Sequence, residues 1–151
     1  MRRLSVIAGS AARGMLRAVL DTNVVVSAHL KADGPASLIF RLALSRYFQC
    51  FVSDDLFQEY SEVLRREKFM LDADDVARSL RAFRAAAFMV TPHSSIFAAR
   101  DPDDDKVLEC AIEAKADYVV TGNVRDFPQT FRGVAVVLPR RFLDLLTSDS
   151  E

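Results

Sequence analysis

Four acidic side chains and one amide stand where predicted strands end or beside the apolar faces of predicted helices. Asp21 ends the apolar segment AVLD, and Glu59 lies beside the apolar stripe of a predicted helix. Asp104 falls on a second such stripe, whereas Asn123 and Asp126 follow the strand-like segment DYVVT. Carboxylates next to apolar surface are costly unless they are paired or bind a metal. The set therefore suggests a site for a divalent cation.

This oxygen-rich set suits Mg²⁺ or Mn²⁺, which are hard cations that keep several of their waters. Crowded carboxylates repel one another, and their pKa values rise unless a cation is present. A bound cation activates water, orients a phosphate and stabilises charge on the leaving oxygen. In-line attack by water would leave a 5′-phosphate and a 3′-hydroxyl, a polarity that follows from the reaction type alone. The pattern is compatible with one ion or with two.

Helical geometry separates the acids that face the protein from those that face water. In its predicted helix, Glu59 lies at the edge of the apolar stripe, whereas Glu62 lies nearly opposite, toward solvent. In the segment DPDDDKVLECA, Asp104 projects near the centre of the inward side and Asp105 lies at its edge. The alternatives are a boundary surface acid for Glu59 and complementation of the helix dipole by the aspartates. The predicted inward side of the second helix comprises Val107, Leu108, Ala111 and Lys115.

Asp21 follows an apolar strand, and the carboxyl ends of strands in open α/β sheets border the ligand crevice. The T-G-N segment 121–123 occupies the matching place after a later strand, where Asn123 can lend an uncharged oxygen to a cation. Asp126 lies three residues further on, within reach of the same crevice. An Asx turn at Asp21 and turn or cap roles for Asn123 and Asp126 are the alternatives. The neighbours predicted to orient these ligands by hydrogen bonds are Thr22, Asn23 and Thr121.

Composition limits the class of protein. The chain has 151 residues, half of them hydrophobic, which is enough for one domain with a substantial core. The net charge of −1 provides no global basic field, so a nucleic-acid ligand needs a local basic patch. Two groups of basic residues are either such patches or solvated helix faces: Arg78, Arg81 and Arg84, and Arg65, Arg66 and Lys68.

The cysteines and the hydropathy pattern indicate a cytoplasmic protein. Cys50 and Cys110 fall in apolar stretches and are predicted to be reduced core residues. The two histidines, His29 and His93, have no zinc-ligand spacing. No run of 18 or more apolar residues occurs, so we predict no transmembrane helix.

Strand-like and helix-like segments alternate, which favours an α/β fold with a mostly parallel sheet. The predicted strands are 17–21, 49–53, 88–92, 117–121 and 134–138. The predicted helices are 35–47, 54–66, 72–86, 102–115 and a final helix through Phe142, Leu143 and Leu146, with a short helix or turn at VRDF. We predict one domain over 15–147, a disordered extension over 1–14 and a short tail over 148–151, with Met1 or Met15 as the start.

The order and spacing of these motifs resemble the PIN-domain ribonucleases, and within them the VapC-like toxins, over about 15–146. LDTNVVVSA resembles the first family motif, with Asp21 as the first metal-binding acid. SDDLFQEYSEVL resembles the second and places the family glutamate at Glu59. DPDDDKVLECAIEAKADYVVTGN resembles the third, with the third acid at Asp104 and Asp105 as its neighbour.

The resemblance implies a five-stranded, parallel α/β/α sandwich that cleaves single-stranded or structured RNA with Mg²⁺ or Mn²⁺. It also implies a small antitoxin protein, encoded nearby, that holds the toxin inactive, and a homodimer. The chain departs from the family pattern at Asn123, where an aspartate is common. The site then has one negative charge fewer, so either Asp126 compensates or metal affinity falls.

Two further classes of function remain open from the sequence. The first is a catalytically weak PIN-like module that binds RNA or a protein, and Asn123 supports it. The second is a phosphotransfer protein. A receiver domain needs an aspartate after its third strand and a lysine after its fifth, where this chain has Thr91 and Leu138. A haloacid-dehalogenase-type phosphatase needs a second aspartate at the position of Asn23.

Overall fold

A computed structural model describes residues 15–93 and 102–149 of the chain. The predicted extension over 1–14 lies outside the described residues, as does the end of the predicted tail. The elements in chain order are β1 (Arg17–Leu20), α1 (Thr22–Leu30), α2 (Pro35–Leu44), β2 (Gln49–Ser53), α3 (Asp54–Leu64), the 3-10 helix η1 (Glu67–Phe69), α4 (Ala73–Ala86), β3 (Phe88–Val90), α5 (Pro102–Ala114), β4 (Tyr118–Val120), the 3-10 helix η2 (Val124–Asp126), β5 (Thr130–Phe131), β6 (Val134–Val137) and α6 (Pro139–Asp149).

The strands form one sheet in the order β3-β2-β1-β4-β6-β5. All neighbouring strands are parallel except β5 and β6, so the predicted α/β fold with a mostly parallel sheet is confirmed. The predicted number of five strands is wrong, because the sheet has six strands within the described residues. The additional strand, β5, joins β6 through Arg132 and Gly133, which both have positive φ, as a tight hairpin turn requires. Its two residues are too few to give an alternating pattern.

The first helix, α1, is the other main difference from the prediction, which placed the first helix only after the Gly34-Pro35 break. The segment contains three consecutive valines, and β-branched residues have low helix propensity. Val24 and Val25 are nevertheless buried in the core, and Asp21 caps the helix by accepting a hydrogen bond from the Thr22 N–H. Burial of the apolar face and the cap therefore outweigh the propensity.

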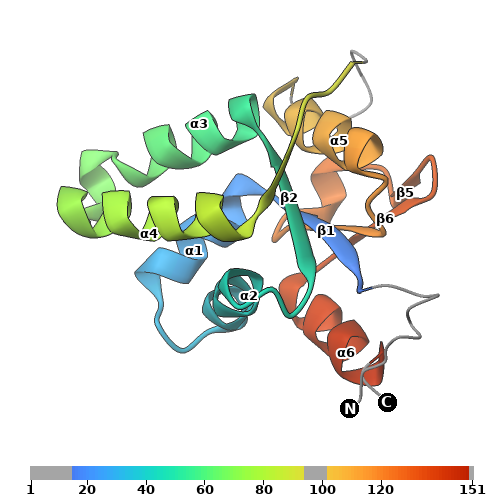
Figure 1. The fold of residues 1–151 in the computed structure, drawn as a ribbon, viewed down its shortest axis with the longest axis horizontal. Coiled ribbons are helices and arrows are strands. Elements are labelled where there is room, and N and C mark those ends of the chain that lie inside the picture. Colours follow the sequence, from blue (N-terminus) through green and yellow to red (C-terminus); the bar gives the residue numbers. More distant parts are fainter. Residues whose placement is uncertain (1–14, 94–101, 150–151) are drawn as a thin grey trace.

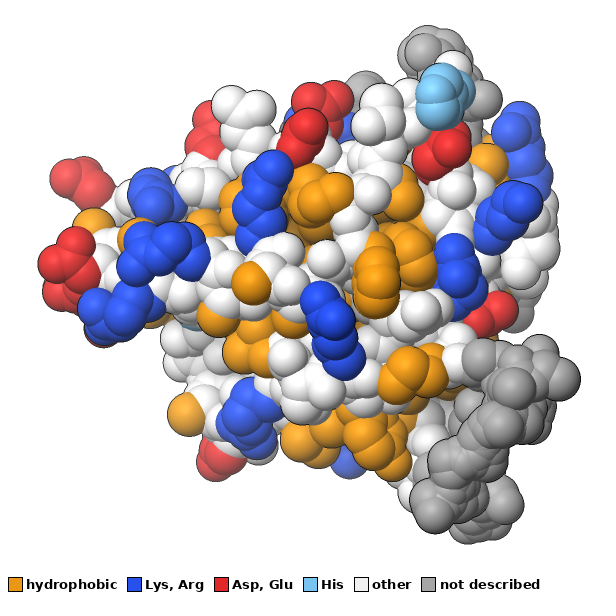
Figure 2. Space-filling model, viewed as in Figure 1, with side chains coloured by type: hydrophobic (Ala, Val, Ile, Leu, Met, Phe, Trp, Pro, Cys, Tyr) orange, Lys and Arg blue, Asp and Glu red, His pale blue; other side chains and the backbone are white. Residues whose placement is uncertain are grey.

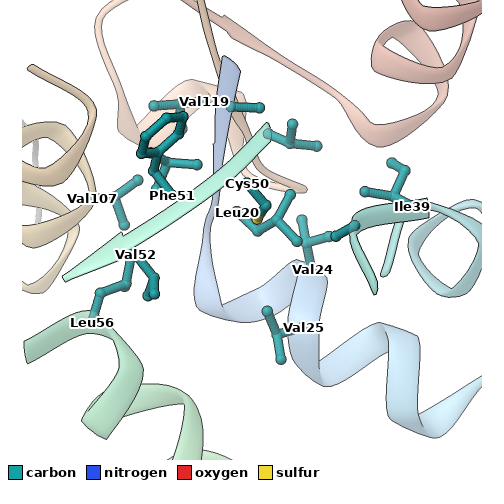
Figure 3. Packing of buried hydrophobic residues seen from close by; sticks show 14 of the residues in the cluster. Leu20, Val24, Val25, Ile39, Cys50, Phe51, Val52, Leu56, Val107 and Val119 are labelled. Atoms are coloured by element: carbon teal, nitrogen blue, oxygen red, sulfur yellow. The ribbon is translucent and has the colours of Figure 1, made fainter. Parts of the chain in front are cut away.

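Helices cover both faces of the sheet (Figure 1). α5 packs on one face against β1, β2, β3 and β4, while α1 and α2 lie against each other on the opposite face. Figure 3 shows Phe51 and Val107 on one side of β2 and Val24 and Ile39 on the other. Cys50 is buried with a free thiol, and so is Cys110, as the sequence predicted. No helix among the described residues is long and apolar enough to cross a membrane.

The parallel sheet gathers residues that are far apart in sequence at one edge. Leu20 of β1 is in register with Val120 of β4, so Asp21 and Thr121 follow neighbouring strands at the same edge. β2 ends alongside them at Ser53, whose hydroxyl accepts a hydrogen bond from the Leu56 N–H and caps α3. The loops and helix starts that follow these strands therefore meet at this edge of the sheet.

Tyr60 ties α3 to the end of β1. Its side chain is fully buried, packs against Phe83, and donates a hydrogen bond from its hydroxyl to the Leu20 carbonyl at 2.5 Å. Burial raises the pKa of Tyr60 well above its ordinary value, so the hydroxyl remains a donor. Because Glu59 precedes Tyr60 on α3, and Asp21 follows Leu20, this bond fixes the two acids relative to each other.

Tyr60→Phe should lower the free energy of unfolding by roughly 1–3 kcal/mol, because it leaves the Leu20 carbonyl without its hydroxyl partner. Tyr47→Phe is the matched control: Tyr47 is 49% exposed, and we expect a change within about 0.5 kcal/mol. Urea unfolding of both variants measures the difference. Equal stability of the two variants would show that the Tyr60 hydroxyl contributes nothing to this junction.

Candidate active site

Asp21 is the buried centre of the site, with 4% of its surface exposed. Its Oδ1 accepts a hydrogen bond from the Thr22 N–H at 2.8 Å, and its Oδ2 accepts one from the Thr121 hydroxyl at 2.7 Å. Thr121 is itself fully buried. These two bonds hold the carboxylate in one orientation between the N-terminus of α1 and the end of β4.

Glu59 reaches the same place from α3. Its Oε2 accepts a hydrogen bond from the Thr22 hydroxyl, so Thr22 bridges the two acids by bonding Asp21 through its N–H and Glu59 through its side chain. The Glu59 side chain is 15% exposed, whereas Glu62, three residues further along α3, is exposed. The helix faces predicted for Glu59 and Glu62 are therefore confirmed.

Lys106 completes this cluster and was not predicted. Its Nζ lies 3.3 Å from Oε1 of Glu59, and its side chain is 37% exposed. The residue belongs to the DDDK segment at the start of α5, where we considered only the acids. A lysine one turn after a helix start, beside several acids, suggested an ion pair in the sequence. Its partner could not be identified, because Glu59 lies 47 residues away in the chain.

The loop after β4 is fastened by Asn23, which does not contact the Asp21 carboxylate in the way we predicted. Its Oδ1 accepts a hydrogen bond from the Gly122 N–H at 3.1 Å, and its Nδ2 donates one to the Thr121 hydroxyl at 3.4 Å. The Thr121 hydroxyl also accepts a bond from the Asn123 N–H at 3.0 Å. Asn123 is exposed and makes no side-chain cap bond to η2. Asn23 therefore positions the loop rather than the carboxylate.

The charge around Asp21 is unbalanced. Burial raises the pKa of Asp21, and the hydrogen bonds from Thr121 and Thr22 oppose that shift. The negative charges of Glu59 and Asp126 raise the pKa further, so Asp126 in η2 lies within electrostatic reach of Asp21. An excess of negative charge in a poorly hydrated place is what a bound cation relieves.

The acids of α5 differ in burial from the prediction. Asp105 is buried, with 6% exposed, whereas Asp104 is half-buried. We predicted the opposite order from the face toward the sheet, but α5 also packs against α3, so it is covered from a second side besides the sheet. Lys115 is exposed and has φ of 53°, because α5 ends before it. Its predicted place on the inward side is wrong.

The donor atoms of this cluster suit a hard cation, because the carboxylates of Asp21, Glu59 and Asp126 offer only oxygen. Within residues 15–93 and 102–149, no three His, Cys, Asp or Glu side chains form a ready metal cluster. A groove of about 570 Å³ borders the cluster at Glu59 and Lys106 and is also lined by Asp55, Gln58, Ser61 and Glu62.

Comparison with known proteins identifies the family of this chain. The family model of the PIN domain matches residues 17–125, which is more than half of the chain. The chain belongs to the PIN domain family. PIN domains are generally metal-dependent nucleases that act on RNA. The matched segment of this PIN domain includes Asp21, Glu59 and Asp104, but ends just before Asp126.

This PIN domain is also similar to an uncharacterized archaeal protein. The relative is MJ1680 of Methanocaldococcus jannaschii, which is 27% identical over 113 residues. The alignment covers 72% of this chain and 71% of the relative. The similarity therefore extends over most of both chains.

The raised pKa of Asp21 predicts a pH-dependent difference between wild type and Asp21→Asn in metal-free buffer. Folded protein keeps the Asp21 proton to a higher pH than unfolded protein does. The stability of the wild type relative to the variant should therefore fall as pH rises from about 4 through the raised pKa, and then level off. Urea unfolding at a series of pH values measures this difference. A constant difference between about pH 4 and pH 7 would contradict the unbalanced charge at Asp21.

Proposed function

We propose that this PIN domain is a metal-dependent endoribonuclease that hydrolyses RNA phosphodiester bonds with Mg²⁺ or Mn²⁺. The carrying observation is the junction in which buried Asp21 is joined through Thr22 to Glu59 of another helix. In a family of nucleases, two acids held together in this way would supply oxygen ligands to a cation. Asp21, Glu59 and Asp104 are proposed as the catalytic acids.

Each of these residues is proposed to have its own role in cation binding. Asp21 is held in one orientation by two hydrogen bonds, so it would bind a cation without losing rotamer freedom. Glu59 and Asp104 would add charge from α3 and α5. A bound cation lowers the pKa of a coordinated water and stabilises charge on the leaving oxygen. Further oxygen ligands are proposed at Asp105, Asn123 and Asp126, with Thr22, Asn23 and Thr121 supporting them.

Several basic side chains of the fold make structural hydrogen bonds or ion pairs. Arg17 donates to the Ala114 carbonyl at the end of α5, and Arg46 donates to the last carbonyls of α4. Arg84 lies 3.4 Å from Asp54, and Arg78 pairs with Asp75. Figure 2 shows lysine and arginine side chains spread over the α4 face rather than gathered in one patch. RNA binding would then depend on shape and on the cation as much as on arginines.

A finer proposal is that the protein is the toxin of a toxin–antitoxin pair, active in the cytoplasm as a homodimer and restrained by a small antitoxin. It rests on the motif resemblance to the VapC-like toxins. The genomic neighbourhood tests it: a short open reading frame that overlaps or directly precedes this gene and encodes a DNA-binding protein is expected. Co-expression of that protein should abolish cleavage, and unchanged cleavage would reject it as the antitoxin.

The second candidate function is a catalytically weak PIN domain that binds RNA or a protein partner. Asn123 favours it, because an amide at this loop contributes no charge to the site. A single measurement distinguishes the two candidate functions, namely whether RNA cleavage depends on Asp21, Glu59 and Asp104. Binding without cleavage in Mn²⁺ would favour the weak module.

Asp21→Asn and Glu59→Gln should each lower kcat/KM for RNA cleavage in Mn²⁺ by roughly 100-fold or more, because each removes a charged cation ligand. Glu62→Gln is the matched control on the same helix, since Glu62 is exposed, and we expect a change of about threefold or less. Cleavage of a panel of RNAs measures all three variants. Full activity of Asp21→Asn would rule out the nuclease site proposed here.

Mn²⁺ should stabilise the protein against unfolding. At a hundredfold excess over the dissociation constant, linkage predicts about 2.7 kcal/mol for a single site. Thermal unfolding with and without millimolar Mn²⁺ measures the effect, and Asp21→Asn should lose it. Absence of any shift in the wild type would count against cation binding at this site.

A further inference from the structure

Lys106 and Thr22 together occupy both oxygens of Glu59. Oε1 lies 3.3 Å from the Lys106 ammonium, and Oε2 accepts the hydrogen bond of the Thr22 hydroxyl. The ion pair is largely shielded on the acid's side, because the Glu59 side chain is only 15% exposed. The carboxylate that is proposed to bind a cation therefore already has a positive partner.

The local charges explain why such a partner is useful. Asp21 experiences the negative charges of both Glu59 and Asp126 in a place with little water. Without a cation, three neighbouring carboxylates repel one another and oppose folding of this edge of the sheet. A lysine ammonium beside Glu59 offsets part of that repulsion.

We propose that Lys106 is an internal counterion that occupies Glu59 in place of the divalent cation, so that the lysine and the cation compete for this carboxylate. The inference rests on the proposed function, since it requires that Glu59 binds the cation. A divalent cation at Glu59 and an ammonium 3.3 Å from the same carboxylate would repel each other strongly. The lysine therefore has to withdraw when the cation binds.

The surroundings of Lys106 permit that withdrawal. Its side chain is 37% exposed and borders the groove of about 570 Å³ beside α3. A lysine has a flexible four-carbon stem and a strongly hydrated head group, so it can turn into the groove. Asp55 lines the same groove and offers the lysine negative charge there. The resting protein is thus stabilised, while its affinity for the cation is lowered.

The test is Mn²⁺ binding to RNA-free protein, measured by electron paramagnetic resonance of the free ion. Lys106→Met should tighten the dissociation constant by roughly threefold to tenfold, because the competing charge is gone. Lys106→Arg keeps the charge and should stay within about twofold of the wild type. Lys68→Met is the control for net charge: Lys68 lies over the Phe69 ring on η1, and its loss should leave Mn²⁺ affinity unchanged.

An affinity of Lys106→Met equal to or weaker than that of the wild type would overturn the inference, as would equal tightening by Lys68→Met. Lys106→Gln serves the same purpose if the methionine variant does not fold, as judged by circular dichroism. Asp21→Asn separates this failure from that of the proposed function. If the wild type binds Mn²⁺ no better than Asp21→Asn, both proposals fail. If the wild type binds more tightly but Lys106 has no influence, only the counterion inference fails.

Discussion

Burial of the Asp21 carboxylate at the carboxyl edge of the parallel sheet is the constraint on which the rest of the site depends. An ionised group with 4% exposure is tolerated only where hydrogen bonds replace the lost water. The Thr22 N–H at the start of α1 and the Thr121 hydroxyl after β4 supply them. This single side chain therefore joins the first helix to the centre of the sheet, and it retains an excess of negative charge that a cation can relieve.

The same contacts that build the fold also assemble the site. The Tyr60 hydroxyl fixes α3 against the end of β1, and the Thr22 hydroxyl then brings Glu59 to Asp21. On the opposite face, Arg17 caps α5 through the Ala114 carbonyl and stacks over the Phe51 ring at 4.5 Å. Packing of the core thus determines how closely the acids approach one another. Arginines that serve as helix caps are correspondingly less free to bind RNA phosphates.

Membership of the PIN domain family is the reason for proposing that this acidic junction binds a metal, because PIN domains are generally metal-dependent nucleases. The particular features of this chain are the uncharged Asn123 and the ion pair between Lys106 and Glu59. Both reduce the net negative charge of the site. A site with less negative charge costs less to fold without its cation but attracts that cation more weakly. If the site binds a cation as proposed, stability of the resting protein and cation affinity are therefore opposed in this domain.

The sequence by itself determined the parallel core strands, the exposed Glu62 and the position of Glu59 at the edge of the apolar stripe, because periodicity along a strand or helix encodes which face is buried. It also identified Asp21 as a candidate ligand and Thr121 as its supporting neighbour, through their places after apolar strands. Only the tertiary structure decided that α1 forms despite its valines, that β5 pairs with β6, and that Asp105 is more buried than Asp104. It alone brought Lys106 to Glu59, across 47 residues of chain. Local patterns record the exposure of a residue, whereas the identity of its distant partner depends on how complete elements pack.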